Sequence, residues 1–202
     1  MDSDEVKYWV AFSRIPTIGW ARFTLVDGYF GSLEKALSAG GAELEAAGLD
    51  QRSVKAVLSR RPTVSPEAEM ERLARLEIET FTIRDPGYPH LLREVYEYPP
   101  VLYVKGKILP EDERSVTVVG TRKPTAYGRE VAHQIAGDLA RSGVTIVSGL
   151  ARGIDAVAHR AALEAGGRTL AVLANGLDTV YPPEHASLAQ EICRRGALIS
   201  EH

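Results

Sequence analysis

The stretch Val147-Ser-Gly-Leu-Ala-Arg-Gly-Ile-Asp-Ala-Val-Ala-His159 joins an apolar run to a helical pattern through a turn that holds two glycines. The apolar run at residues 144–147 predicts a buried strand, and the small residues after Gly153 predict a helix. A strand, a glycine turn and a helix are typical of a phosphate site. Gly149 and Gly153 are separated by three residues, however, and this spacing fits neither the dinucleotide fingerprint G-x-G-x-x-G nor the Walker lysine loop.

The same alternation extends on both sides of this stretch. Apolar runs at residues 115–119, 144–147, 169–173 and 197–200 predict strands, the first of them buried. Helical patterns at residues 127–141, 154–165 and 184–194 separate these runs, and glycines end each pattern. In the first helix we expect Val131, Ile135 and Leu139 to share one stripe. Strands that alternate with helices predict an α/β, Rossmann-like, mostly parallel sheet with helices on both faces.

The N-terminal part of the chain has a different pattern. Residues 1–62 read as short helices separated by glycines, which predicts a small all-α domain. Its turn Ile15-Pro-Thr-Ile-Gly19 has the shape of the hairpin in helix-hairpin-helix modules, which offer main-chain N–H groups to a DNA phosphate. An ordinary turn between two helices is the equally open alternative. Residues 61–66 suggest a linker, and residues 66–202 form the predicted extended Rossmann-like domain.

Composition excludes several classes of protein. The chain has 202 residues, 45% of them hydrophobic, and a net charge of −3, which argues against a protein that coats nucleic acid by bulk charge. The acidic start does not read as a secretory signal, and no apolar run approaches the length of a membrane span. With Cys193 as its single cysteine, the chain cannot form an internal disulfide, and we expect a reducing cytoplasm.

Three loops follow the carboxyl ends of predicted strands and are rich in small polar residues. They span residues 120–128, 148–153 and 174–183, and together they predict one pocket, because ligands of open α/β sheets bind at this edge. Gly149 and Gly153 would let an anion approach main-chain N–H groups at a helix N-terminus. The cationic and hydroxyl side chains that these loops and the helix behind them add are Arg122, Lys123, Arg129, Ser148 and Arg152.

Asp155 and His159 lie one helical turn apart and could form an acid–base or metal-binding pair. The simpler interpretation is an aspartate that holds the loop, with the histidine as its hydrogen-bond partner. A metal site needs at least a third ligand, and the sequence has no Cys/His cluster or HExxH motif. Cys193 lacks a credible base and is not expected to be a nucleophile. We therefore expect no catalytic residue, no metal and no cofactor, which fits a pocket for a nucleic-acid backbone.

Several motifs together resemble the DprA/Smf family of DNA-processing proteins. They are Val118-Val-Gly-Thr-Arg122 with Tyr127-Gly128, Val147-Ser-Gly-Leu-Ala-Arg-Gly-Ile-Asp155 with His159, Leu170-Ala-Val-Leu-Ala-Asn-Gly-Leu-Asp178 with Tyr181-Pro182, and Leu198-Ile-Ser-Glu201. Asp85-Pro-Gly-Tyr-Pro89 and Pro100-Val-Leu-Tyr-Val-Lys-Gly106 fit as well. The resemblance runs from about residue 80 to the end of the chain, and the helical N-terminal region matches only in type, as a SAM-like or helix-hairpin-helix domain.

The resemblance implies a protein that binds single-stranded DNA with its Rossmann-like domain and is not an enzyme. Family members protect incoming DNA in natural transformation, help to load the RecA recombinase and work as homodimers. The resemblance assigns DNA binding to the positions that match the family's phosphate loops, and the loop sequence adds Lys123. The full set is Gly120, Thr121, Arg122, Lys123, Ser148, Gly149, Leu150, Ala151, Arg152, Gly153, Asp155, Asn175 and Gly176.

The chain departs from the family pattern at its end. Family members continue past the Ser-Glu motif with a Phe-containing loop and an Arg-Asn-Arg segment, and often end in a winged-helix-like domain, whereas this sequence ends at Glu201-His202. We therefore expect an incomplete sheet at the C-terminal end. Part of the binding wall and of the dimer surface is then expected to be missing.

Two other functions stay open from the sequence. The first is an enzyme on a related Rossmann-like fold that binds or cleaves a nucleotide ligand, for which Asp155 is the strongest candidate acid. The second is a module in which the N-terminal helices dock a protein partner. Binding of a mononucleotide rather than a polymer would favour the enzyme.

Overall fold

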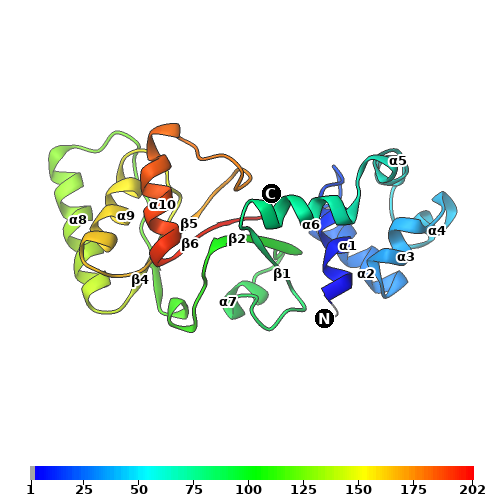
Figure 1. The fold of residues 1–202 in the computed structure, drawn as a ribbon, viewed down its shortest axis with the longest axis horizontal. Helices are drawn as coiled ribbons and strands as arrows, with labels where there is room; N and C mark the ends of the chain where they lie inside the picture. The colour runs from blue at the N-terminus through cyan, green and yellow to red at the C-terminus, as the bar shows by residue number, and fades with distance from the viewer. Residues whose placement is uncertain (1–2) are drawn as a thin grey trace. The chain divides into compact units, whose positions relative to one another are not determined.

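The structure, a computed structural model, describes residues 3–202, which divide into two compact units (Figure 1). The first unit runs to Leu76 and includes Thr80–Leu102, and the second comprises Glu77–Glu79 and Tyr103–His202. The linker predicted at residues 61–66 lies within the first unit, where a 3-10 turn is followed closely by a helix. No helix among residues 3–202 is long and apolar enough to cross a membrane.

The first unit consists mainly of helices. Two strands, β1 (Glu79–Thr82) and β2 (Val101–Gly106), cross the division between the units along the sequence. The helices are α1 (Ser3–Ser13), α2 (Trp20–Phe30), α3 (Leu33–Ser38), α4 (Gly41–Ala46), α5 (Gln51–Arg60), η1 (Arg61–Thr63), α6 (Pro66–Arg75) and α7 (His90–Arg93).

Aromatic side chains of α1 and α2 form the centre of this unit. The rings of Trp9 and Phe12 contact the ring of Phe23, with centroids 5.0 and 5.9 Å apart, and all three residues are buried. The guanidinium of Arg84 lies 5.2 Å from the Trp9 ring centroid and binds Asp27 at 2.7 Å. Arg84 thereby connects the segment after β1 to α1 and α2, which explains why residues 80–102 belong to the first unit.

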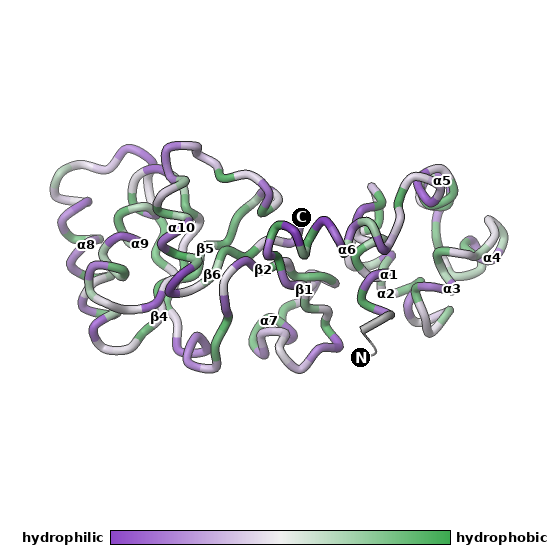
Figure 2. The backbone as a smooth tube through the Cα atoms, in the orientation of Figure 1, coloured by the Kyte–Doolittle hydropathy of each residue, from purple (hydrophilic) through white to green (hydrophobic). Residues whose placement is uncertain are grey.

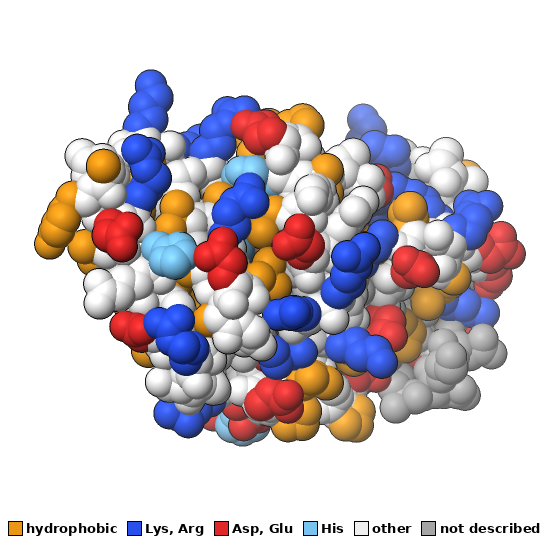
Figure 3. Space-filling model, turned by 60° about the vertical axis from the view of Figure 1, so that its left-hand side comes forward, with side chains coloured by type: hydrophobic (Ala, Val, Ile, Leu, Met, Phe, Trp, Pro, Cys, Tyr) orange, Lys and Arg blue, Asp and Glu red, His pale blue; other side chains and the backbone are white. Residues whose placement is uncertain are grey.

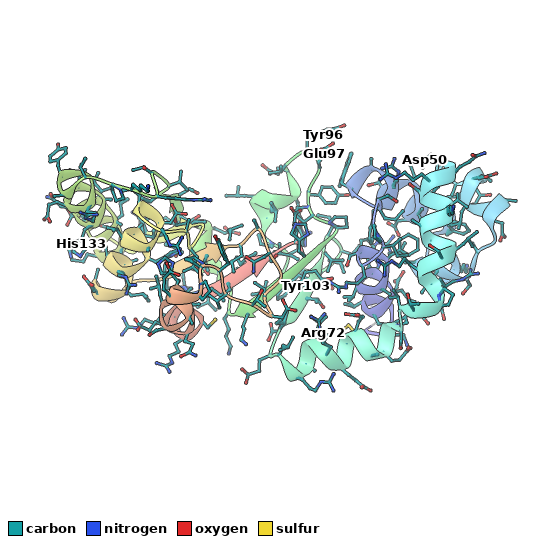
Figure 4. All side chains as sticks on the ribbon, turned by 90° about the horizontal axis from the view of Figure 1, so that it is seen from above. Asp50, Arg72, Tyr96, Glu97, Tyr103 and His133 are labelled. Atoms are coloured by element: carbon teal, nitrogen blue, oxygen red, sulfur yellow. The ribbon has the colours of Figure 1, made fainter. Side chains whose placement is uncertain are left out.

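The predicted hairpin turn between α1 and α2 is tied to the start of α5. The Asp50 carboxylate caps α5 by accepting a hydrogen bond from the Ser53 N–H at 2.8 Å, and its other oxygen lies 2.6 Å from the Arg22 guanidinium (Figure 4). The hydrogen bonds from Arg22 and Ser53 lower the pKa of Asp50 to about 2. Arg22 also donates to the Thr17 carbonyl in the turn at 3.2 Å. These contacts hold the turn, and a role for it in DNA binding stays a prediction.

The second unit contains the predicted alternation of strands and helices. Its elements are η2 (Pro110–Glu113), β3 (Ser115–Thr117), α8 (Ala126–Arg141), β4 (Thr145–Ser148), α9 (Ile154–Glu164), β5 (Thr169–Val172), η3 (Pro183–His185), α10 (Ala186–Arg195) and β6 (Ala197–Ser200).

The strands form a mixed sheet in the order β1-β2-β6-β5-β4-β3. Strands β3, β4, β5 and β6 are parallel, with Val116 opposite Ile146 and Val147 opposite Leu170, and β2 runs antiparallel to β6. All four residues of β6 and the first four of β2 are buried, and their hydrophobic residues are green in Figure 2. The α/β class with a mostly parallel sheet is confirmed.

Helices α8 and α9 pack on β4 through small side chains. The buried cluster consists of Ala136, Ala140, Ile146, Ala158, Ala161 and Ala162. Of the residues in the predicted stripe, Leu139 packs against this cluster, whereas Ile135 is half exposed and the alanines form the buried face instead. A helix that presents alanines can lie close to its neighbour, so the α8–α9 contact needs no large residue.

The prediction that residues 115–119 form a buried strand is also wrong. The strand covers only Ser115–Thr117, and all three residues are exposed. The physical reason is its position at the end of the strand order, where it pairs with β4 alone.

A buried carboxylate secures the amino end of this sheet. Asp112 accepts hydrogen bonds from Arg168 at 2.8 and 2.9 Å, from the Thr145 hydroxyl at 2.8 Å and from the Leu109 N–H at 2.8 Å. Burial alone would raise the pKa of Asp112, but these hydrogen bonds and the Arg168 charge outweigh it and hold the pKa below its usual value. The pair therefore connects η2 to the starts of β4 and β5.

We predict that Asp112→Ala lowers the free energy of unfolding by about 3 kcal/mol, because it leaves a largely buried guanidinium without its counter-charge. Urea unfolding followed by circular dichroism measures the change. The matched control is Asp138→Ala, which removes an exposed partner of Arg141 and should cost about 0.5 kcal/mol. Equal effects of the two substitutions would contradict the structural role of Asp112.

Candidate functional site

The three predicted loops all lie at the carboxyl edge of the parallel strands. They follow β3, β4 and β5, which are neighbours in the sheet and run in the same direction. The structure therefore brings residues 120–123, 148–155 and 175–176 to one edge, as the sequence predicts. Their role in binding stays a prediction, which the geometry below makes specific.

The first two loops are joined by direct main-chain contact. The Ile154 N–H donates to the Thr121 carbonyl at 3.2 Å, and the Ser148 hydroxyl donates to the Val118 carbonyl at 2.6 Å. A Cβ atom at Gly153 would lie 2.2 Å from the Thr121 oxygen and 2.7 Å from the Arg122 Cα, so no other residue fits there without a shift of the backbone. Gly153 is required by this contact as well as by its φ of +83°.

Gly120 also allows the first loop to approach the second loop closely. A Cβ atom at Gly120 would lie 2.8 Å from the Cγ1 atom of Ile154, the first residue of α9. The two glycines therefore let the first loop rest on the N-terminus of α9. One consequence is that Arg122 lies directly against the glycine turn.

Asp155 is the organiser of the second loop. Its side chain is buried, and Oδ2 accepts hydrogen bonds from the Gly149 N–H at 3.1 Å and the Ala151 N–H at 3.4 Å. The Asp155 carboxylate thus occupies the place at the Gly149 and Ala151 N–H groups where the sequence predicted a bound anion. Among residues 3–202, the N–H groups of Leu150, Arg152 and Gly153 donate to no other group.

Leu150 anchors the loop to the core. Its side chain is fully buried and its φ is +58°, a left-handed conformation that costs about 1 kcal/mol or more for a residue with a Cβ atom. The Leu150 carbonyl accepts a hydrogen bond from His185 Nδ1 at 2.8 Å. Leu150 can therefore contribute to binding only through its main chain.

His159 does not pair with Asp155, contrary to the simpler interpretation of the sequence. Its Nδ1 lies 2.7 Å from the Thr169 hydroxyl, which itself donates to the Ile146 carbonyl at 2.7 Å. Since the hydroxyl proton is used, Nδ1 must carry the imidazole proton. Nε2 is then a buried acceptor without a partner among residues 3–202. Burial, with a smaller effect of His185, lowers the pKa of His159 to about 3.

Some of the cationic side chains have partners within the fold and others do not. Arg122 and Lys123 are exposed, and their side chains form no ion pair among residues 3–202. Arg152 is held by Glu184 from η3, and Arg129 donates to the Pro124 carbonyl at 3.1 Å. The hydrogen bond to Glu184 raises the pKa of Arg152, and that from Arg152 lowers the pKa of Glu184.

The third loop is held mainly by the side chain of Asn175. The Asn175 amide donates to the Gly176 carbonyl at 2.9 Å and the Thr179 carbonyl at 2.8 Å. The Asn175 carbonyl accepts from the Ser200 hydroxyl at 2.8 Å, which joins this loop to the end of β6. Asn175 therefore shapes the loop, and its amide hydrogens are already used.

The described residues offer little for catalysis. No group of three or more His, Cys, Asp or Glu side chains within residues 3–202 is placed to hold a metal ion. Cys193 is partly buried, and burial raises the pKa of its thiol. The site combines main-chain donors with exposed cationic side chains, an arrangement suited to binding a phosphate.

Residues that shape the loops from a distance were missed in the sequence. His185 and Glu184 reach Leu150 and Arg152 from positions more than thirty residues later. Nothing in the spacing indicated Glu184. The only signal for His185 was its place after two prolines, in a turn that brings it back towards the second loop.

Comparison with known proteins gives consistent matches. A family model described as DNA recombination-mediator protein A matches residues 79–202. Protein Smf of Synechocystis is 36% identical over 207 residues, covering all of this chain and 52% of the relative. DNA processing protein DprA of Bacillus subtilis is 42% identical over 126 residues, covering 62% of this chain and 42% of the relative. The chain thus spans about half the length of these curated relatives.

Two solved structures are similar. DprA from Streptococcus pneumoniae superposes with a TM-score of 0.77 at 28% identity, over 97% of this chain and 67% of that one. A structure of DprA from Helicobacter pylori, described for its single-stranded DNA binding mode, has a TM-score of 0.55 at 30% identity. That match covers 62% of this chain and 56% of the other.

We predict that buried His159 makes the protein less stable in acid. In the unfolded chain a histidine binds a proton below about pH 6.5, whereas folded His159 stays neutral down to about pH 3. The unfolded state binds more protons throughout this window, so stability falls as the pH falls. Between about pH 7 and pH 5 the wild type should lose about 2 kcal/mol more than His159→Gln in urea unfolding.

The control is His133→Gln, because His133 is half exposed on α8 and pairs with Glu164 (Figure 4). At pH 7 its free energy of unfolding should stay within about 0.5 kcal/mol of the wild type, because only an exposed pair is lost. NMR of the histidine rings gives a second measurement that needs no variant. A His159 ring that titrates near pH 6.5 would disprove the assignment.

Proposed function

Since the chain belongs to the DNA recombination-mediator protein A family, we propose that it binds single-stranded DNA at the carboxyl edge of its parallel strands. The observation that carries the proposal is the contact between Arg122 and Gly153. It sets the backbone of Arg122, whose exposed side chain has no ion pair among residues 3–202, against the turn that holds the unused N–H groups of Arg152 and Gly153. A DNA phosphate would accept hydrogen bonds from the Arg122 side chain and from these N–H groups.

The net charge of the chain does not by itself attract DNA. The net charge is −3, and Figure 3 shows Lys and Arg side chains interspersed with Asp and Glu on the face that it presents. Affinity for a polyanion must then come from local geometry. The candidate contacts are the residues of the three loops, with Lys123 and Arg152 as additional cations, Thr121 as a further polar side chain, and Gly120, Asp155 and Asn175 as residues that shape the loops.

Binding without catalysis fits the site better than the nucleotide-ligand enzyme. Asp155 was the strongest candidate acid, and its carboxylate is buried and engaged by two main-chain donors. His159 is buried and hydrogen-bonded to Thr169. With neither group presented to a ligand, we infer that the protein acts by holding DNA rather than by altering it.

The wider role is proposed from the family. As a recombination mediator the whole protein would protect incoming DNA during natural transformation, help to load RecA and act as a homodimer in the cytoplasm. The description of the Helicobacter pylori relative by its single-stranded DNA binding mode supports the DNA-binding part. Pull-down of RecA in the presence and absence of single-stranded DNA tests the partnership.

We expect Arg122→Ala to weaken binding of a fluorescein-labelled oligothymidylate by about tenfold or more, as for the loss of a charge-assisted hydrogen bond of about 1.5 kcal/mol. The slope of log affinity against log salt should fall by about 0.7, since one phosphate contact is lost. Fluorescence anisotropy over a salt series measures both. The control is Arg141→Ala, at the opposite end of α8, and an unchanged affinity and slope in Arg122→Ala would refute the site.

Glu184→Gln should have the opposite effect. It releases Arg152 from its ion pair and removes a negative charge beside the loop, so affinity for the same strand should rise about two- to fivefold. Glu164→Gln removes the same charge from the far end of α9 and should leave affinity unchanged. Weaker binding by Glu184→Gln would show that the ion pair positions Arg152 for the ligand instead of competing with it.

A further inference from the structure

Two tyrosines at the carboxyl edge of the sheet are exposed and have no contacts of the kind that hold the other tyrosines. Tyr127 lies in the first turn of α8 and is 79% exposed, and Tyr181 lies in the third loop and is 64% exposed. Among residues 3–202, neither side chain has a hydrogen bond or a ring contact.

The other six tyrosines are accounted for within the fold. Tyr88 and Tyr103 are buried, and the Tyr8 hydroxyl donates to Glu34 at 2.7 Å. Tyr29 packs on Phe30, and Tyr96 and Tyr98 pack on Trp20 (Figure 4). Tyr127 and Tyr181 are therefore exceptions in this chain, and both lie in or beside the loops that carry the proposed site.

Both tyrosines belong to loops that also carry or contact cationic residues. Tyr127 follows Arg122 in the loop that begins α8, where Thr125 caps the helix by accepting from the Gly128 N–H at 3.1 Å. Tyr181 is close enough to Arg152 to interact with it electrostatically, and Glu184, three residues later, binds the same arginine. The two tyrosines thus lie on the first and third loops, on either side of the second loop in the order of the strands.

Two exposed valines lie at the carboxyl ends of β3 and β5, from which the first and third loops continue. Val119, directly after β3, and Val172, the last residue of β5, are 66% and 50% exposed. Parallel strands are normally covered on both faces, so exposed apolar side chains at their ends indicate a surface that a ligand covers. A surface of rings and valines beside cationic loops matches a strand whose bases are unpaired.

We propose that Tyr127 and Tyr181 are base-stacking residues, which hold the bases of a strand whose phosphates bind the loops. The inference rests on the proposed function and deepens it. Every base has an aromatic face, so stacking is tolerant of sequence, and in a duplex those faces are already covered. The two tyrosines thereby account for a preference for single strands that phosphate contacts alone do not supply.

The test compares an oligothymidylate with a strand of the same length made of abasic sites, which has the phosphates and no bases. Fluorescence anisotropy gives the affinity for each. Tyr127→Ala and Tyr181→Ala should each weaken binding of the oligothymidylate by about tenfold and leave binding of the abasic strand unchanged. Tyr127→Phe and Tyr181→Phe keep the ring and should bind as the wild type does. The control Tyr29→Ala removes a half-exposed tyrosine of α2 and should change nothing.

The outcomes separate this inference from the proposed function. If the wild type binds the abasic strand as tightly as the oligothymidylate, stacking is wrong and phosphate binding stands. Loss of affinity for both strands in the alanine variants would also overturn stacking, because the effect would not depend on bases. If the wild type binds neither strand, the proposed function itself fails.

Discussion

The contact between the first loop and the glycine turn is the constraint on which the rest of the site depends. The Ile154 N–H meets the Thr121 carbonyl, and Gly153 has no room for a side chain because the Thr121 oxygen and the Arg122 backbone fill that space. This contact makes one surface of two loops that lie about thirty residues apart in the sequence. It also explains the spacing of Gly149 and Gly153, since each glycine accommodates a different neighbour, the Asp155 carboxylate and the first loop.

Much of the second unit could be predicted from the sequence, because its signals are local. The helix expected at residues 154–165 is Ile154–Glu164, and the strand expected at residues 197–200 is Ala197–Ser200. Glycines follow the ends of the helices, and short apolar runs define the strands. The edge position of β3 could not be predicted, since strand order is a property of the whole sheet. The buried face of α8 was missed because its alanines contrast little with the larger residues beside them.

The site was predicted in its location and less well in its internal contacts. The motifs indicated which loops meet, because parallel strands end at one edge of the sheet. They did not indicate that Asn175 and Asp155 use their polar atoms within their own loops, nor that Thr169 rather than Asp155 binds His159. Such choices depend on the backbone conformation of each turn, which the spacing of residues does not specify. The same limit applies to Glu184, which only the folded structure brings to Arg152.

Asp155 has a consequence for how a ligand would bind. A loop with many main-chain donors usually needs an external anion to hold it in one conformation, and ordering it on binding reduces the affinity. Here the buried Asp155 side chain already accepts hydrogen bonds from two of these donors, so the loop is preorganised before any ligand arrives. Such a surface can release and rebind a ligand without refolding.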